Sequence, residues 1–500
     1  MLSMKRLLLP SFLVALLFAF ASPLLAQTHF VAFLEGSEEQ DATFAVSPHG
    51  YAHITLSEDR SQITYMVNVW KTTTNDPMGH FHTGPRKYNG PIRKNLTFDS
   101  GVVATGVWRS SDIDEPLTQD IIDSLLAGKL YVNAHTLNNP GGELRGQFFQ
   151  PESYWAFATA QQEVPDPGKD TLVGGAAALF VRDPINNILY YRATANALSS
   201  PATMAHIHKG AIGEAGPPVK NTNIDSSTIT TSGYWTPDDQ SQPFTAEQYE
   251  ALRNGQLYWN IHTKLHGPGE LRGQIGKPEG YLFTALLSGP SEAIGSGGEG
   301  TAILLLSPQL DRLYTVAATA GLSGPILDGH IHVGRPPMDG PPVVNTPRTP
   351  FGLIHEWTST DQDRPLTRAD VDSLFAGAYY INLHTAKFPA GELRGQIIPL
   401  DQEPGQARTE FVVRTGEIAV SASRNPVREM TNINYELPYP MRVELTLIDV
   451  TGKAVWQEVQ SGDKGRNVCP LSARELAAGT YVLQVLAGGE SASMNLVVTK

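Results

Sequence analysis

Residues 257–274 read LYWNIHTKLHGPGELRGQ, and the pattern returns at residues 130–147 (LYVNAHTLNNPGGELRGQ) and 379–396 (YYINLHTAKFPAGELRGQ). In every copy the glutamate follows the histidine of the Asn-x-His-Thr segment by eight residues. A tryptophan precedes that histidine by 27 residues, and the threonine of a Leu-Thr or Phe-Thr pair precedes it by 17. Such fixed offsets indicate one structural module that is repeated three times in tandem.

Upstream of this pattern, every copy has two histidines separated by one residue. With the histidine of the pattern they form three sets: His80, His82 and His135; His206, His208 and His262; and His330, His332 and His384. Alternate residues of a strand face the same side of a sheet, so each His-x-His presents two imidazoles together. A third imidazole from a neighbouring strand would complete a set of nitrogen ligands suited to copper, zinc or nickel. We treat these nine histidines as candidate metal ligands, with Cu or Zn as the expected ion if any cofactor is bound.

The same region also permits a structural interpretation. Each copy places a glutamate two residues before an arginine, and the six residues are Glu143, Arg145, Glu270, Arg272, Glu392 and Arg394. We expect each arginine to pair with its glutamate, because residues two apart share one face of a strand. The glutamates could orient a metal ligand or complete the site. Alternatively, all these polar groups form a buried network that fixes the strand register, since each unpaired group costs about 1–3 kcal/mol.

The apolar runs predict an all-β fold. Each module has a first run that ends at a glutamate, a second strand that begins at a glycine, and a third β-branched or aromatic run. These are Phe30–Glu39, Trp155–Glu163 and Leu282–Glu292; Gly50, Gly175 and Gly300; and Ile63–Val69, Leu189–Ala195 and Leu313–Thr319. Regular spacing of such runs with turn signals is typical of a β-sandwich or a barrel-like module.

One short helix is expected in each module. The segments Thr118–Gly128, Thr245–Gly255 and Thr367–Gly377 begin with an N-cap threonine and end at a glycine. Gln248 and Asp370 complete capping boxes in the second and third copies, whereas Ile121 stands at this position in the first.

Composition and the N-terminal residues favour an exported protein. The net charge of −13 and the pI near 5.5 argue against nucleic acid as a partner. Met1–Ala26 has two basic residues followed by an apolar run, so we expect a cleaved signal peptide and no integral membrane segment after its removal. Cys469 is the only cysteine, which excludes disulfide bonds within the chain.

The repeat pattern ends near residue 400, and a different unit follows. Residues 401–415 are polar and are expected to form a linker. In residues 416–500, alternating segments such as Val443–Asp449 are separated by tight turns, which predicts a small Ig-like β-sandwich.

These motifs resemble two known families. The combination of Ala205–Gly210 (Ala-His-Ile-His-x-Gly) with Leu-Tyr-x-Asn-x-His-Thr and Gly-Glu-Leu-Arg-Gly-Gln resembles the CHRD domain, a module named for chordin and found in many bacterial secreted proteins. We expect three such modules at residues 27–150, 151–277 and 278–400. The first departs slightly, with Gly79–Thr83 reading GHFHT. The resemblance implies an extracellular β module and brings no catalytic assignment.

The C-terminal unit resembles the type A sorting domain of the Bacteroidota type IX secretion system. The segments that carry the resemblance are Asn425-Pro426, Ile433–Pro438, Val443–Asp449, Gly452-Lys453, Leu476–Tyr481 and Asn495–Lys500. This resemblance implies export through the outer membrane by the type IX machinery, removal of the tag, and often attachment to the outer surface of the cell.

Two functions follow as alternatives. The favoured one is a noncatalytic protein for binding or adhesion, secreted or held at the cell surface, in which three copies give avidity for an unidentified extracellular ligand. The other is an extracellular protein that binds Cu or Zn, including a metal-dependent oxidoreductase. Catalysis is the least favoured, because the repeat contains no Gly-x-Ser-x-Gly motif, no His-Glu-x-x-His motif and no phosphate-binding glycine loop.

Overall fold

The structure is a computed structural model that describes residues 27–39, 49–74, 77–99, 102–168, 172–226, 229–289, 296–401, 419–423, 427–437, 441–449, 453–462, 465–474, 476–487 and 490–499. The expected signal peptide, most of the expected linker and Glu292 lie outside these residues. The three repeats form one compact unit, and the described residues from Ala419 onward form another. No helix of the described residues is long and apolar enough to cross a membrane.

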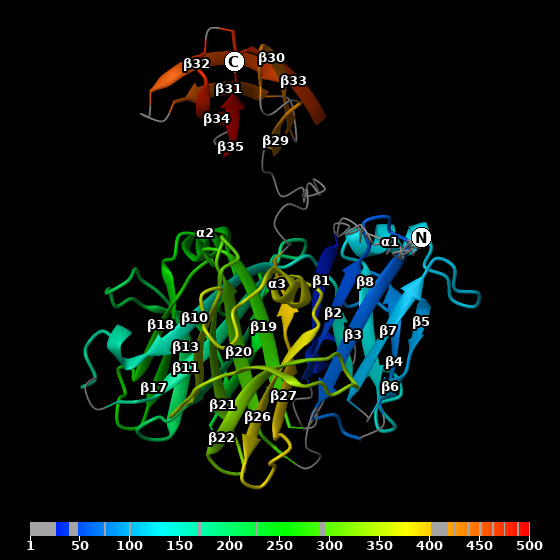
Figure 1. Ribbon diagram of the computed structural model, residues 1–500, viewed down its shortest axis with the longest axis vertical. Coiled ribbons are helices and arrows are strands. Elements are labelled where there is room, and N and C mark those ends of the chain that lie inside the picture. The colour runs from blue at the N-terminus through cyan, green and yellow to red at the C-terminus, as the bar shows by residue number, and fades with distance from the viewer. Residues whose placement is uncertain are drawn as a thin grey trace, which may run out of the picture. The chain divides into compact units, whose positions relative to one another are not determined.

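Each repeat forms one curled antiparallel sheet (Figure 1). The first contains β1 (Thr28–Glu35), β2 (His49–Leu56), β3 (Gln62–Trp70), β4 (Met78–Thr83), β5 (Ile92–Leu96), β6 (Phe98–Asp99), β7 (Val103–Arg109), β8 (Leu130–His135) and β9 (Leu144–Gln147). Its strand order is β5-β4-β8-β9-β1-β2-β3-β7-β6. The sequence therefore correctly predicts an all-β module, and the second and third predicted runs coincide with β2 and β3.

The other two repeats have the same strand order. The second contains β10 (Glu152–Thr159), β11 (Gly175–Asp183), β12 (Ile188–Asn196), β13 (Ala202–Lys209), β14 (Pro218–Asn221), β15 (Ile224–Asp225), β16 (Thr230–Trp235), β17 (Leu257–Thr263) and β18 (Leu271–Ile275). The third contains β19 (Tyr281–Ser288), β20 (Glu299–Leu306), β21 (Arg312–Ala320), β22 (Ile326–Val333), β23 (Pro342–Asn345), β24 (Arg348–Thr349), β25 (Gly352–Thr358), β26 (Tyr379–Thr385), β27 (Leu393–Gln396) and β28 (Ile398–Pro399). Strands from the two ends of each sheet approach each other, as β13 and β15 do, which makes the modules barrel-like.

The first strand of each module is shorter than predicted. β1 ends at Glu35 and β10 ends at Thr159, and a single 3-10 turn follows each of them, at Gly36–Glu38 and Ala160–Gln162. The predicted runs to Glu39 and Glu163 are therefore wrong at their ends, because the 3-10 turn ends each strand before the glutamate.

The predicted helices are confirmed as α1 (Gln119–Leu126), α2 (Ala246–Arg253) and α3 (Arg368–Phe375). Both predicted capping boxes form, at Thr245 with Gln248 and at Thr367 with Asp370. Thr118 stands at the predicted N-cap of α1, and its capping box is absent as expected from Ile121, but its side chain also makes no cap bond to the backbone, which was not predicted. Glycines with φ of 66°, 64° and 61° follow the helices at Gly128, Gly255 and Gly377.

Each module has its own apolar core, and a fourth cluster joins all three. The indoles of Trp108, Trp235 and Trp357 are fully buried within their modules. The joining cluster includes Val31, Phe33 and Tyr51 of the first module, Leu179, Val181 and Tyr190 of the second, and Leu282, Ile303 and Val316 of the third. The three modules therefore share buried surface within one compact unit.

The C-terminal unit is a two-sheet sandwich, as predicted. One sheet contains β29 (Ala419–Ala422), β30 (Met430–Leu437) and β33 (Gly465–Ser472); the other contains β31 (Met441–Ile448), β32 (Ala454–Gly462), β34 (Gly479–Ala487) and β35 (Glu490–Val498). Cys469 is a buried free thiol in the core between them.

Candidate metal centres

The nine histidines gather in three sets, one in each module. His80 and His82 lie on β4 and His135 lies on the neighbouring strand β8, where His135 is paired with Met78 and His82 with Tyr131. Phe81, between the two histidines, points into the apolar core, so the imidazoles occupy the opposite face of the sheet. One nitrogen from each ring lies within 4.8 Å of the other two, and the equivalent histidines of the second and third modules do the same.

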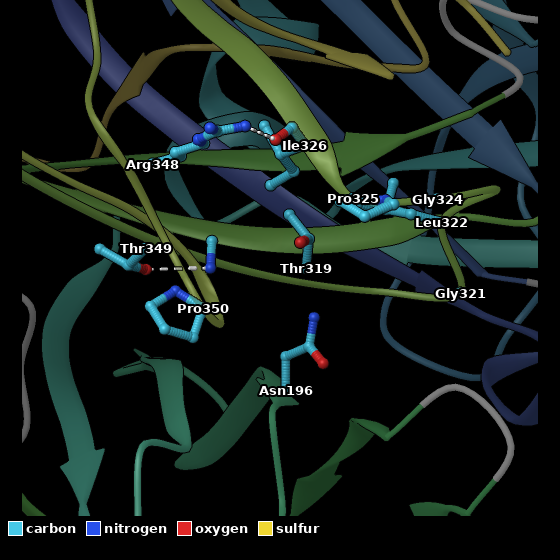
Figure 2. Close-up of a pocket in the computed structure, with 11 residues that line it drawn as sticks. Asn196, Thr319, Gly321, Leu322, Gly324, Pro325, Ile326, Arg348, Thr349 and Pro350 are labelled. Atoms are coloured by element: carbon cyan, nitrogen blue, oxygen red, sulfur yellow. Dashed lines mark hydrogen bonds between the residues drawn. The ribbon is translucent and has the colours of Figure 1, made fainter. Parts of the chain in front are cut away.

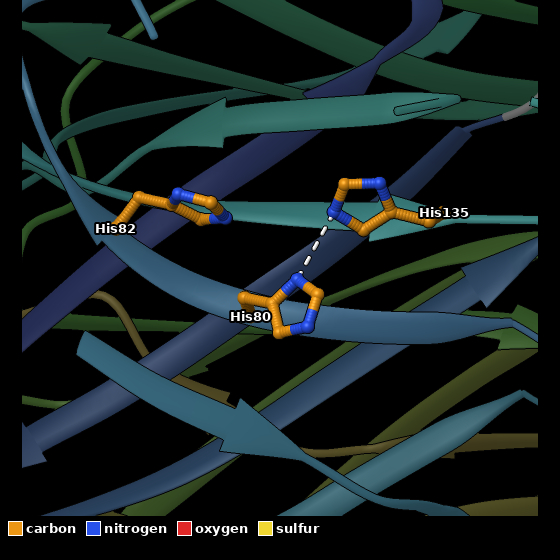
Figure 3. A group of neighbouring side chains, drawn as sticks. All are labelled: His80, His82 and His135. Carbon is orange, nitrogen blue, oxygen red and sulfur yellow. Dashed lines mark hydrogen bonds between the residues drawn. The ribbon is translucent and has the colours of Figure 1, made fainter. Parts of the chain in front are cut away.

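Hydrogen bonds orient two of the three rings in the first module. The Nδ1 of His82 is 2.9 Å from the carbonyl of Gly90, and the Nδ1 of His135 is 3.0 Å from the carbonyl of Pro140. Each Nδ1–H therefore donates to a carbonyl, which leaves a lone pair on each Nε2, and the Nε2 of His135 accepts the Nδ1–H of His80. The Nε2 of His135 lies 3.1 Å from the Nδ1 of His80, and Figure 3 shows the rings converging.

The same contacts recur in the other modules. His208 and His332 bond the carbonyls of Gly216 and Gly340, both at 2.8 Å. The distal histidines bond the carbonyls of Gly267 and Pro389 at 2.9 and 3.1 Å. Each distal Nε2 lies 3.1 Å from the Nδ1 of the first histidine of its set. Repetition in three different sequence contexts indicates that the arrangement is a property of the module.

The ligand atoms fit a transition-metal ion. The Nε2 atoms of His82, His208 and His332 are buried without a hydrogen-bond partner in the described residues. Nitrogens bound 2.0–2.1 Å from a tetrahedral ion are about 3.3 Å apart, close to the 3.1 Å between the facing rings. Burial lowers the pKa of His82 and of His206 to about 4, so both rings are neutral and able to bind metal at pH 7.

Three glycines that the sequence analysis missed hold this geometry. A Cβ on Gly90, Gly216 or Gly340 would lie 1.8, 1.6 or 1.7 Å from a backbone carbonyl oxygen, so only glycine fits where the loop carbonyl reaches the histidine ring. Each of these glycines follows the second histidine of its set by eight residues. That fixed offset was the signal in the sequence that could have identified them.

The glutamates that follow the distal histidines by eight residues bind the segment that precedes the first histidine of each set. Glu143, Glu270 and Glu392 are fully buried and each accepts a backbone N–H at 2.7 Å and a hydroxyl at 2.6 Å, from Thr73, Ser199 and Ser323 respectively. Burial would raise the pKa of Glu143, but hydrogen bonds from Thr136, Thr73 and Asn139 hold it below its usual value. The hydroxyl residues precede the first histidine by seven positions in each copy, a second offset that was overlooked.

The predicted pairing of arginine with glutamate is wrong in the first two modules. Arg145 lies 3.6 Å from the centre of the Tyr131 ring and donates to the carbonyls of Pro85 and Tyr88. Arg272 makes the equivalent contacts with Tyr258, and Arg394 lies over Tyr380. The glutamate precedes the strand, which begins at Leu144 after Gly142 with φ of 134°, so strand alternation does not extend to it.

The arginines and glutamates therefore hold different parts of the module. Arg145 fastens the loop whose Gly90 carbonyl orients His82, whereas Glu143 fastens the chain before β4. Neither side chain bonds a histidine among the described residues. The role of these six residues in a structural network stays a prediction.

One cavity lies apart from the histidines, between the second and third modules. It has a volume of about 650 Å³ and is lined by Asn196, Thr319, Ile326, Arg348, Thr349 and Pro350 together with neighbouring glycines (Figure 2). Arg348 is the only charged side chain of this lining, and it donates to the carbonyl of Ile326 at 3.0 Å. The cavity thus presents no convergent set of titratable groups.

Comparisons with known proteins match both halves of this description. Residues 30–148, 155–275 and 283–397 each match the family model of the CHRD domain. Residues 425–499 match the secretion system C-terminal sorting domain. Chordin of Danio rerio is 29% identical over 168 residues, which are 31% of this chain and 17% of chordin.

Among solved structures, a biofilm associated protein BSP domain aligns over 88% of this chain and 93% of its own length, with 9% identity and a TM-score of 0.14. An alpha-2-macroglobulin from Escherichia coli aligns over 87% of this chain and 29% of its own, with 9% identity and a TM-score of 0.15. Both TM-scores lie below the range in which two chains share a fold.

Proposed function

Because this chain belongs to the CHRD family and ends in a type IX sorting domain, we propose that it is an exported protein whose three modules each bind one Cu or Zn ion. The ligands are the three histidines of each module. The sorting domain indicates secretion, and attachment to the outer surface of the cell is part of the proposal.

One repeated observation supports the metal sites. His82, His208 and His332 are 7, 8 and 9% exposed, and the Nε2 of each is buried without a partner in the described chain while its Nδ1 is fixed by a carbonyl. A hydrogen-bonded structural network would satisfy both nitrogens, because each unsatisfied buried group costs about 1–3 kcal/mol. A metal ion that binds the Nε2 lone pair of His82, His208 or His332 would remove the cost of leaving that nitrogen unsatisfied in each module.

The arrangement has the parts that metal ligands need. Carbonyl oxygens bonded to the outer N–H of a ligating histidine fix its tautomer and raise its basicity. Three protein nitrogens leave a fourth position on a tetrahedral ion for water or another ligand. The first histidine of each set is only partly buried, so this position is open to molecules from solution.

Binding or adhesion is a second proposed function, and a separate observation supports it. The three modules share the cluster around Phe33, Tyr190 and Ile303, so any surface repeated in the modules is presented in three copies at fixed spacing. Such spacing supports multivalent binding to a repetitive extracellular ligand.

Elemental analysis of the purified mature chain tests the metal sites. We expect close to three ions of Cu or Zn per chain, and close to two after His208→Ala. His266→Ala is the matched control, since His266 belongs to the same module but to none of the three sets. The proposal fails if the chain holds no ion and melts at the same temperature with and without added metal, because a ligand of the native state must raise its stability.

A further inference from the structure

The three candidate centres differ at the position two residues before the first histidine. Met78, Met204 and Asp328 occupy it in the first, second and third modules. Each is paired across the sheet with the distal histidine of its set: Met78 with His135, Met204 with His262, and Asp328 with His384. Paired residues of antiparallel strands present their side chains on the same face, so this position borders every centre.

In the third module the carboxylate of Asp328 contacts a candidate ligand. Its Oδ2 is 3.2 Å from the Nε2 of His330, and its Oδ1 accepts the backbone N–H of Gly329 at 2.9 Å. Both oxygens are engaged, which fixes the carboxylate. In this structure the Nδ1 of His330 is hydrogen-bonded to the Nε2 of His384 at 3.1 Å. A shift of the His330 proton to Nε2, where Asp328 faces it, would direct the Nδ1 lone pair toward a bound ion.

Among the described residues, only the third centre has an oxygen atom within 3.2 Å of the outer nitrogen of every histidine. Asp328, the carbonyl of Gly340 and the carbonyl of Pro389 serve His330, His332 and His384 respectively. In the first two modules the described residues provide carbonyl acceptors for two histidines only. A methionine thioether, which is a weak acceptor, occupies the position of Asp328 there.

We propose that Asp328 is a positioning residue that makes the third module the tightest of the three sites for divalent ions, an inference that rests on the proposed metal function. An acceptor behind a ligating histidine selects the metal-binding tautomer and raises the basicity of the ring. Loss of such partners lowers metal affinity by about 10–100-fold. Asp328 is 60% exposed, and solvent screens its charge, so we expect the lower end of this range.

Two full-length double variants each retain one candidate centre, so that its affinity can be measured alone. The double variant His82→Ala with His208→Ala retains only the third centre, and His82→Ala with His332→Ala retains only the second. Titration of each metal-free chain with Zn²⁺ should give a tighter dissociation constant for the third centre by about tenfold. Asp328→Met should remove that difference, and Met204→Asp should tighten the second centre by a similar factor.

Two controls separate positioning from charge. Asp328→Asn keeps an oxygen that can accept the Nε2–H, so it should retain most of the affinity that Asp328→Met loses. Asp363→Asn removes an exposed acid of the same module, and it should leave the affinity unchanged. If Asp328→Asn loses as much Zn²⁺ affinity as Asp328→Met, the positioning role of Asp328 is overturned.

The outcomes of these titrations distinguish the proposed role of Asp328 from the proposed metal binding on which it rests. Chains that bind Zn²⁺ at both centres with equal affinity, unaltered by either exchange of residues, would leave the metal function standing and overturn the role of Asp328. Chains that bind no ion at any centre would overturn both.

Discussion

At the scale of single residues, the sequence predicts which side chains meet but not how they are oriented. The His-x-His spacing and the distal histidine were sufficient to place three imidazoles together, because strand alternation fixes the face of each residue. The tautomers depend on carbonyls from loops such as Gly210–Val219, whose path no periodicity encodes. The contact of Glu270 with Ser199 was also not foreseen, although the hydroxyl residue precedes the first histidine by seven positions in every module.

Acidification should destabilise the metal-free chain. Burial lowers the pKa of His29, His82 and His206 to about 4, whereas the unfolded chain takes up a proton near pH 6.5. Below pH 6.5 the unfolded state therefore binds more protons, so the free energy of unfolding falls as the pH drops from 6.5 to 4. The loss is on the order of 3 kcal/mol for the fully buried His29, and it is smaller for the partly exposed His206 because solvent screens its charge.

Thermal melts of chelator-treated protein between pH 4 and pH 7 measure this effect. Replacement of His82 by glutamine should reduce the slope of stability with pH, because glutamine does not titrate. A chain whose stability is constant over this interval would contradict the assignment of neutral buried rings. Bound metal should steepen the loss, since protons compete with the ion for the same nitrogens.

The buried glutamates are predicted to act on stability and not on metal affinity. Glu270→Ala leaves the backbone N–H and hydroxyl of Ser199 and the hydroxyl of Thr263 without their acceptor, which should lower the free energy of unfolding by about 2–4 kcal/mol. Glu279→Ala, at an exposed position, should change it little. A loss of metal from the second module with unchanged stability would instead make Glu270 part of the metal site.

At the scale of elements, local chemistry determined the helices and most of the strands. N-cap threonines and C-terminal glycines predicted the three helices. A glycine followed by a β-branched or apolar run predicted β2, β11 and β20. The first strands were overextended because the predicted runs were carried on to the glutamate, although the polar residues Gly36–Glu38 form a 3-10 turn after the strand. A turn of three residues leaves too short a pattern to separate from the strand before it.

The three N-caps allow a matched test. Thr245 and Thr367 accept a backbone N–H from the third helical residue, and Thr118 does not. Replacement by alanine should destabilise α2 and α3 by about 1 kcal/mol, which accelerates amide exchange in their first turns about fivefold. The same change at Thr118 should have a smaller effect on α1. Equal acceleration in all three helices would show that the side-chain cap bond is not the cause.

At the scale of the whole molecule, the main feature that the sequence analysis did not anticipate is the cluster that joins the three modules. Residues 30–34 read FVAFL, and Phe30, Ala32 and Leu34 fill the core of the module while Val31 and Phe33 enter the joining cluster. A strand that is apolar on both faces is typical of burial on both sides. Each run taken alone is explained by the core of its own module, so its second apolar face does not by itself identify the neighbouring module.

The joining cluster predicts that the modules do not unfold independently. Tyr190 of the second module stacks on Phe33 of the first at 5.1 Å and on Phe149 at 5.5 Å. Tyr190→Ala should cost about 3–5 kcal/mol and increase amide exchange in β1 as well as in β12. Tyr88→Ala, at an exposed residue, is the control. If amide exchange in β1 is unchanged in the Tyr190→Ala variant, the first and second modules are not energetically coupled and each module is a folding unit of its own.

Export should depend on the C-terminal sandwich, which has its own apolar core including Val443, Leu445 and Leu447. We expect a chain without residues 416–500 to accumulate in the periplasm of a host with a type IX system, because the sorting domain is the part that the machinery handles. Leu447→Asp places a charge in that core and should retain the chain in the same way, since a buried unpaired charge prevents the sandwich from folding. His82→Ala alters only the first candidate metal centre and should leave export intact. Cell fractionation distinguishes these results, and normal surface display of the truncated chain would show that the sandwich is not the export signal.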